Sequence, residues 1–234
     1  MSTELHPTCA KCGNRVCYPS ISNNENPPVA KAPPFCPMKL HSQVIEKAAS
    51  EYEKPSVKEF ARLASLQEFE CYESVPEGRR AKIPRIEELL QFAHKCGYKK
   101  LGLAFCIGLA GEAQVLTEIL ERHGFEIVSV CCKLGAVRKE SLGLEPWEKI
   151  GGPDKWESMC NPIAQAKVLN AEAVDLGIML GLCIGHDTLF IQHCHVPLTV
   201  LAVKDRVTGH NPLAALYLSS SYYSRLMVRE PPGT

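Results

Sequence analysis

The stretch LGLAFCIGLAGEAQVLTEILERHGFEIVSVCC, residues 101–132, decides the fold of this chain. It opens on the apolar run LGLAFCIG, which predicts a buried strand. Residues 112–123 repeat apolar side chains at helical spacing and stop at Gly124, and the apolar run FEIVSVCC follows at 125–132. Strand, helix and strand in this order are typical of two parallel strands joined by a crossover helix.

The same alternation of helix and strand continues on both sides of this stretch. The further elements expected are helices over 84–96 and from Asn161-Pro162, and strands at 175–185 and 197–205. Unbroken apolar strands joined by helices form sheets that are covered on both faces. The sequence therefore predicts an α/β domain over 81–234, with a mostly parallel, Rossmann-like sheet and flanking helices.

The chain before residue 81 differs in composition. Residues 1–38 combine four cysteines with many prolines and almost no apolar periodicity, so no conventional core is expected to order this segment. Residues 39–80 are expected to form a helical pair, interrupted at Pro55, that packs on the main domain because two short helices cannot bury their apolar stripes alone. Three parts are therefore predicted, with boundaries at 38/39 and 80/81.

Charge balance and hydropathy exclude two classes of partner. The 234 residues carry 26 basic and 26 acidic side chains, for a formal net charge of zero. This balance argues against nucleic-acid or membrane-surface binding driven by charge. No apolar run approaches the roughly 18 residues of a membrane helix, and the start MSTELHPTCAKCGNR lacks the apolar core of a signal peptide. We therefore expect a cytoplasmic protein that binds neither nucleic acid nor membrane.

Twelve cysteines in a reducing compartment indicate metal ligation or thiol chemistry rather than disulfides. Four of them lie in the N-terminal segment, as Cys9-x2-Cys12-x4-Cys17 followed by Cys36. Thiolates spaced as CxxC reach one ion from a tight turn, and two more complete a four-thiolate site. Such a site suits zinc, a single iron or a [4Fe–4S] cluster, and the spacing does not choose among them. The alternative is a disordered tail with incidental thiols.

A second set of cysteines stands at the ends of predicted strands or just before a helix. It comprises Cys106, Cys131, Cys160 and Cys183, with Cys132 as the alternative to Cys131 because neighbours on a strand point to opposite faces. Ends of parallel strands share one edge of the sheet, where helix N-termini stabilise thiolates, so these thiols are expected to form a second metal or redox site. The alternative is ordinary packing, since free cysteine behaves as a small hydrophobe.

Polar residues follow two of these strands. Gly185-His186-Asp187 comes directly after Cys183, which makes His186 a candidate general acid or ligand, oriented by Asp187. Lys204-Asp205-Arg206 ends the last strand and is a further candidate. Asp187 is equally suited to cap the next helix, and the second group to form local ion pairs. GxGxxG, GxxxxGK[ST] and GxSxG are absent, which argues against a dinucleotide site, a P-loop and a nucleophile-elbow hydrolase.

Several motifs occur in an order that resembles a known family. They are CAKCGNRVC (9–17), FCP (35–37), GYKKLGLAFCIGLAGEA (97–113), GFEIVSVCCKLG (124–135), CNPIAQAKVLN (160–170), GLCIGHD (181–187) and VKDRVTGHNP (203–212). Over most of its length the chain resembles a prokaryotic family described as uncharacterised metal-binding proteins of unknown function. The resemblance implies metal binding through Cys9, Cys12, Cys17 and Cys36, and also through Cys106, Cys160 and Cys183, but it implies no reaction.

These observations lead to one main hypothesis and two alternatives. The main hypothesis is an iron–sulfur protein with a [4Fe–4S] cluster at the N-terminal site and a second cluster at the strand ends. An open position near His186 would bind a small molecule, making the protein an oxidoreductase served by an electron-transfer partner. The first alternative is a zinc protein with a structural N-terminal site and a non-redox α/β domain that binds a ligand or partner. The second is a thiol enzyme with Cys106 or Cys183 as nucleophile.

Overall fold

The computed structural model describes residues 5–18 and 28–228. By its internal contacts the chain divides into two compact units, residues 1–66 and 67–234, which are described separately. This division falls within a helix and differs from the predicted boundaries at 38/39 and 80/81. In the described part of the chain, no helix is both long and apolar enough to cross a membrane.

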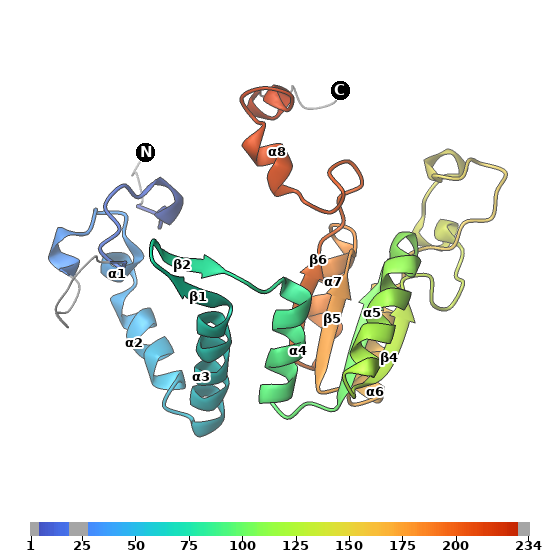
Figure 1. The fold of residues 1–234 in the computed structure, drawn as a ribbon. Helices are drawn as coiled ribbons and strands as arrows, with labels where there is room; N and C mark the ends of the chain where they lie inside the picture. Colours follow the sequence, from blue (N-terminus) through green and yellow to red (C-terminus); the bar gives the residue numbers. More distant parts are fainter. Residues whose placement is uncertain (1–4, 19–27, 229–234) are drawn as a thin grey trace. The chain divides into compact units, whose positions relative to one another are not determined.

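The second unit contains a four-stranded, fully parallel sheet in the order β4-β3-β5-β6 (Figure 1). The strands are β3 (Lys100–Phe105), β4 (Glu126–Cys131), β5 (Leu176–Leu180) and β6 (Leu198–Ala202). The chain runs from β3 to β4 on one side and then crosses to β5 on the other side of β3. Such a reversal creates a switch point outside the carboxyl ends of the strands, where ligands bind in open α/β sheets. The predicted α/β class is confirmed.

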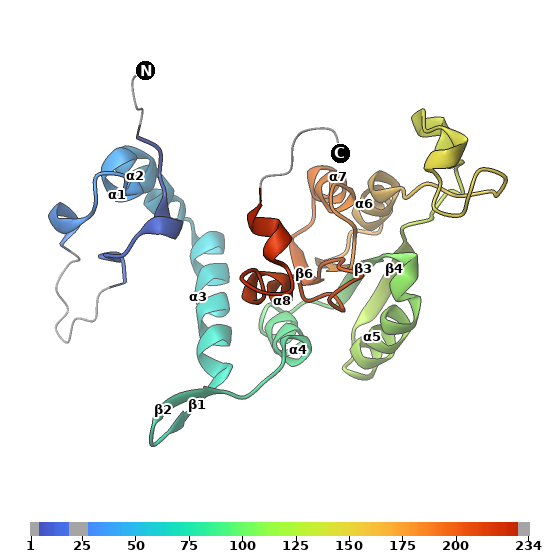
Figure 2. The same cartoon turned by 90° about the horizontal axis from the view of Figure 1, so that it is seen from above.

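Helices cover both faces of this sheet (Figure 2). They are α4 (Arg85–Lys95) and α5 (Ala110–Arg122) on one face, and α6 (Pro162–Ala171) and α7 (His186–His193) on the other. Leu101 and Leu103 of β3 are fully buried with α4 and α5, whereas Ala104 is buried with α6 and α7. A Cβ at Gly102 would lie 2.9 Å from the Leu169 side chain, so this glycine allows α6 to approach the sheet closely.

The first unit is helical and begins with the cysteine-rich segment. Its helices are α1 (Pro37–Leu40), α2 (Ser42–Glu51) and α3 (Pro55–Glu70), the last of which continues into the second unit. Pro37 and Pro55 occupy first helical positions, where the missing N–H costs nothing. A small buried cluster of Val16, Ala32 and Cys36, with Met38 packed against it, orders part of a segment for which no core was expected.

Two elements were not foreseen from the sequence. β1 (Tyr72–Val75) and β2 (Gly78–Ala81) form an antiparallel hairpin where the end of the helical pair was predicted. Every residue of this hairpin is exposed or only partly buried, so the sequence carries no apolar alternation to reveal it. After β6, the described residues form a short helix, α8 (Leu213–Tyr217), and further turns.

Candidate functional site

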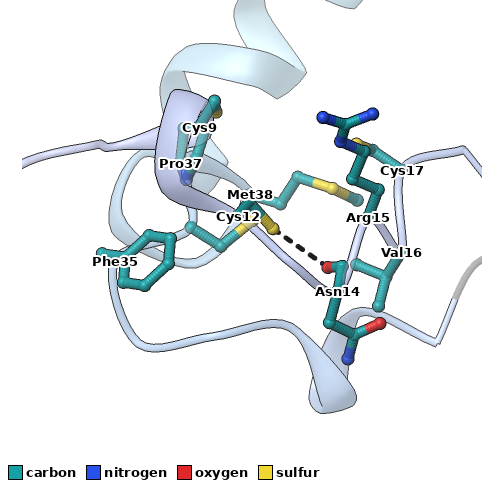
Figure 3. A pocket seen from close by; sticks show the side chains of 10 residues that line it. Cys9, Cys12, Asn14, Arg15, Val16, Cys17, Phe35, Pro37 and Met38 are labelled. Carbon is teal, nitrogen blue, oxygen red and sulfur yellow. Dashed lines mark hydrogen bonds between the residues drawn. The ribbon is translucent and has the colours of Figure 1, made fainter. Parts of the chain in front are cut away.

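The four N-terminal cysteines, Cys9, Cys12, Cys17 and Cys36, line one cavity of about 270 Å³ in the first unit (Figure 3). A single 3-10 turn, in which the Cys12 N–H donates to the Cys9 carbonyl at 3.0 Å, places Cys9 and Cys12 at its two ends. Cys36 is buried, whereas Cys9 and Cys17 are exposed. Among the described residues, no carboxylate lines the cavity, so its chemistry is that of thiols in an otherwise mostly apolar wall.

Hydrogen bonds hold the two cysteine-bearing segments together. The Asn14 side chain donates to the Lys31 carbonyl at 3.1 Å, which links the segment after Cys12 to the segment before Cys36. The Lys39 ammonium donates to the carbonyls of Ala30 and Ala32 at 3.0 and 2.5 Å. These contacts fix the position of the fourth cysteine relative to the first three.

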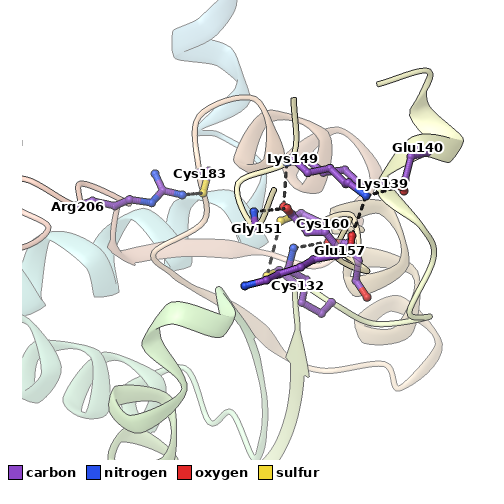
Figure 4. A network of polar contacts seen from close by, with 12 residues as sticks. Cys132, Lys139, Glu140, Lys149, Gly151, Glu157, Cys160, Cys183 and Arg206 are labelled. Carbon is purple, nitrogen blue, oxygen red and sulfur yellow. Dashed lines mark hydrogen bonds and ion pairs between the residues drawn. The ribbon is translucent and has the colours of Figure 1, made fainter. Parts of the chain in front are cut away.

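Three other cysteines lie at the carboxyl edge of the sheet, and Figure 4 shows two of them, Cys132 and Cys160. Cys106 follows β3, Cys132 follows β4, and Cys160 immediately precedes the N-cap of α6. The sulfurs of Cys132 and Cys160 lie 3.9 Å apart. Cys132 also lies near Cys106, and its sulfur accepts the Ile107 backbone N–H at 3.3 Å. We call Cys106, Cys132 and Cys160 the edge thiols.

A long loop joins β4 to α6, and its last residues lie beside the end of β4. The Asn161 N–H donates to the Cys132 carbonyl at 2.8 Å, which sets Cys160 next to the end of β4. The loop is closed again further out, where the Met159 N–H donates to the Val137 carbonyl at 2.8 Å. Two residues distant in sequence are thereby brought into thiol contact by backbone hydrogen bonds rather than by side-chain packing alone.

Ion pairs give this loop an internal structure. Lys149, whose side chain is 3% exposed, donates to a Glu140 carboxylate oxygen at 2.7 Å, and Lys139 pairs with Glu157 at 2.9 Å (Figure 4). Lys133 donates to the Ser158 carbonyl at 2.5 Å, across the base of the loop and next to Cys160. These contacts hold the loop between β4 and α6 in a defined conformation.

The edge thiols have strongly different acidities. Hydrogen bonding to Cys132 lowers the pKa of Cys106 to about 5, with a smaller contribution from Lys204. Hydrogen bonding to Cys132 also lowers the pKa of Cys160 to about 5, aided by Lys133 and His186. The pKa of Cys132 is raised by its contacts with Cys106 and Cys160 and by burial. Cys132 is therefore the least acidic of the three edge thiols.

Cations with no carboxylate partner surround the edge thiols. In the described part of the chain, Lys133, Lys204 and Arg206 form no ion pair with Asp or Glu. Lys204 lies against Gly108, two residues after Cys106, and Arg206 donates to the Cys183 sulfur at 3.2 Å. The Lys204-Asp205-Arg206 group therefore contributes two cations and the Asp205 carboxylate, which accepts the Val207 and Thr208 N–H groups and forms no local ion pair among the described residues.

The other residues predicted at this edge, Cys131, Cys183 and Asp187, contact other groups. The Cys131 sulfur accepts the Lys133 N–H at 3.5 Å, and it is the neighbouring Cys132 that reaches Cys106 and Cys160, since only one of two adjacent strand residues points to a given side. Cys183 contacts Arg206. The carboxylate of Asp187 accepts the N–H of the next residue, Thr188, as a helix-start residue does.

His186 begins α7 and lies near Cys160, although no hydrogen bond joins it to Asp187 in the described residues. Lys133 was missed by sequence reasoning, and its position directly after Cys132 was the available signal. Gln165 was also missed. It is fully buried, and its amide donates to the carbonyls of Phe105 and Val130 at 3.2 and 2.7 Å, which ties α6 to the strand ends that carry the edge thiols.

The described residues contain no preformed site for a single metal ion. Across residues 5–18 and 28–228, no three His, Cys, Asp or Glu side chains are placed as ligands of a single ion. The N-terminal thiols instead surround a cavity, and two of the edge sulfurs are in contact. By donor type and common cavity the N-terminal set fits a soft, thiolate-bound group.

Comparisons with known proteins identify the family. Residues 36–201 match the family described as "Protein of unknown function (DUF1847)". The chain belongs to this family. It is also 36% identical, over 220 residues, to "Uncharacterized protein MJ0455" of Methanocaldococcus jannaschii, which covers 94% of this chain and 97% of the relative.

The DUF1847 match confirms the resemblance to an uncharacterised family. The matched range contains every edge thiol and the fourth N-terminal cysteine, Cys36. Neither the DUF1847 description nor the relative's name mentions a metal or a reaction. Any function of this member of the family has to be argued from its residues.

Proposed function

We propose that this protein binds an iron–sulfur cluster through Cys9, Cys12, Cys17 and Cys36. The observation that carries this proposal is that four thiols from two separate segments line one cavity. Four cysteine thiolates are the usual ligand set of [2Fe–2S] and [4Fe–4S] clusters. The apolar wall and the absence of a described carboxylate suit a thiolate-bound group and disfavour a hard cation.

Four thiolates also form the tetrahedral ligand set of structural zinc sites. Zinc is the alternative that the experiment below separates.

A bound cluster would supply one-electron transfer. The residues of this chain would set its environment. Cys36 is buried beside Val16 and Met38, which exclude water from one side, whereas Cys9 and Cys17 are exposed on another. Burial and solvent access are two of the features by which proteins tune cluster potentials. The exposed side is where we expect an electron-transfer partner to approach.

Metal analysis of anaerobically purified protein tests the proposal. We expect iron and acid-labile sulfide, a brown colour, and loss of both from Cys12→Ser and Cys36→Ser variants. Cys96→Ser, which removes a partly buried thiol at the end of α4, is the matched control and should keep the full iron content. Colourless protein that loses one zinc in the same variants would replace the cluster by the zinc alternative. Metal content that the N-terminal substitutions leave unchanged would reject the site.

The proposal does not place a second cluster at the sheet edge. In a [4Fe–4S] cluster each thiolate binds a different iron, which separates the cysteine sulfurs. Cys132 and Cys160 have sulfurs only 3.9 Å apart, and Cys131 and Cys183 make other contacts. The geometry of the edge thiols supports thiol chemistry instead.

A further inference from the structure

We propose that Cys160 and Cys132 form a redox-active dithiol that reduces a small anionic disulfide. The proposal rests on the distance between the two sulfurs and on the backbone contact beside them. The two sulfurs lie 3.9 Å apart at the switch point of the sheet, and a backbone hydrogen bond of 2.8 Å between Asn161 and Cys132 holds the pair together. This inference concerns the second unit and does not depend on the N-terminal cluster.

Exposure distinguishes the three edge thiols. Cys160 is partly exposed, whereas Cys106 and Cys132 are only 6% and 3% exposed. A substrate from solvent therefore reaches Cys160 first. Cys132 can meet only a partner that is already attached to Cys160, which is the position of a resolving thiol. Cys160 also immediately precedes α6, whose N-terminal dipole stabilises a thiolate.

The electrons and protons balance without any group that the site lacks. The Cys160 thiolate attacks one sulfur of the disulfide RSSR, which breaks the S–S bond, forms Cys160–S–S–R and releases one RS⁻. Cys132 loses its proton to water and attacks the Cys160 sulfur, which forms the Cys132–Cys160 disulfide and releases the second RS⁻. RSSR gains the two electrons that the dithiol loses, and the Cys132 proton passes to solvent.

The charge around the edge thiols selects the class of disulfide. Lys133 and His186 lie near Cys160, and Lys204 lies beside Cys106. Of the nearby carboxylates, Glu157 is paired with Lys139, whereas Asp187 and Asp205 accept hydrogen bonds from backbone N–H groups and keep their negative charge. Lys133 is the ammonium group near Cys160, and its charge favours a substrate that carries a carboxylate or another anionic group.

Limiting amounts of 5,5′-dithiobis(2-nitrobenzoate), an anionic disulfide, test this mechanism on the full-length, anaerobically purified protein. One reagent per chain should release two thionitrobenzoate ions in two phases and leave a cross-link between tryptic peptides 123–133 and 156–167. Cys160 is the sole cysteine of the second peptide. Cys132→Ser should release one ion and retain a mixed disulfide on Cys160.

Two comparisons make the test specific. Cys194→Ser removes another partly buried thiol that packs against the same apolar cluster, and both phases should remain as in the unchanged protein. Replacing Lys133 by Met should slow the first phase by about tenfold with the anionic reagent and much less with neutral 4,4′-dithiodipyridine. Equal slowing of the two reagents would overturn the assignment of an anionic substrate.

Three outcomes would overturn the dithiol. The first is a stable mixed disulfide on Cys160 of the unchanged protein with no cross-link. The second is modification of Cys160 no faster than that of Cys194. The third is a metal ion in the purified protein that the Cys132→Ser and Cys160→Ser variants both lose, because the edge thiols would then be ligands.

Discussion

Removing the Cys132 thiol should change how the reactivity of Cys160 depends on pH. Cys132 supplies the hydrogen bond that contributes most to lowering the pKa of Cys160 from its ordinary value of 9.0 to about 5. In a Cys132→Ala variant that hydrogen bond is lost, while Lys133 and His186 remain. The pKa of Cys160 should therefore rise toward 9.

The rate of Cys160 modification at pH 7 alone does not distinguish the variant from the unchanged protein. At pH 7, a thiol with a pKa of about 5 is roughly 99% thiolate, whereas one with a pKa of 9 is about 1% thiolate. The nucleophilicity of a thiolate rises with its pKa, with a Brønsted coefficient of about 0.4–0.5. A difference of four pKa units therefore makes the thiolate of higher pKa about 40–100-fold more reactive. The two effects nearly cancel at pH 7. The slope between pH 6 and 8 is what differs.

The assay is alkylation of Cys160 by iodoacetamide, followed by mass spectrometry of peptide 156–167. The unchanged protein should give a rate that is nearly independent of pH from 6 to 8, because Cys160 is already ionised throughout. Cys132→Ala should give a rate that rises by up to about tenfold per pH unit. The Cys194→Ala control should keep the flat profile. A rate that climbs steeply in the unchanged protein would refute the assignment of a Cys160 thiolate.

Further predictions concern stability. Gln165→Met should lower the free energy of unfolding by about 1–3 kcal/mol in urea titrations, because two carbonyls at the strand ends lose a buried donor, and an unchanged midpoint would contradict this role. Lys149→Met should speed chymotryptic cleavage after Trp147 several-fold with little change in Tm, since it removes the partner of Glu140 inside the loop; equal cleavage would mean that the ion pair does not hold the loop. The Asp175 carboxylate accepts the N–H groups of residues 99 and 100, which lowers its pKa, so its stabilising effect is present above about pH 4 and is lost as the pH falls through the folded-state pKa. Asp175→Asn should therefore be less stable than the unchanged protein at pH 7 by about 1 kcal/mol and converge with it in acid, whereas a constant difference would argue against the charge.

The α/β class followed from the sequence because its determinants are local. The strand–helix–strand stretch at 101–132 carries uninterrupted apolar runs and a glycine at the helix end, and the structure has β3, α5 and β4 there. Polar hairpins leave no such pattern, which is why β1 and β2 went unpredicted. The order of the strands was also beyond the sequence, because it depends on which strand each helix returns to.

The cysteines show the same division. The sequence by itself placed Cys106 and Cys160 at the carboxyl edge of the sheet and grouped the four N-terminal cysteines by their spacing. Only the tertiary structure decided that Cys132 rather than Cys131 contacts Cys160, and that Cys183 contacts Arg206 instead. The physical reason is that local patterns specify which elements form, whereas contact between thiols separated by a long loop depends on the backbone hydrogen bonds that close the loop.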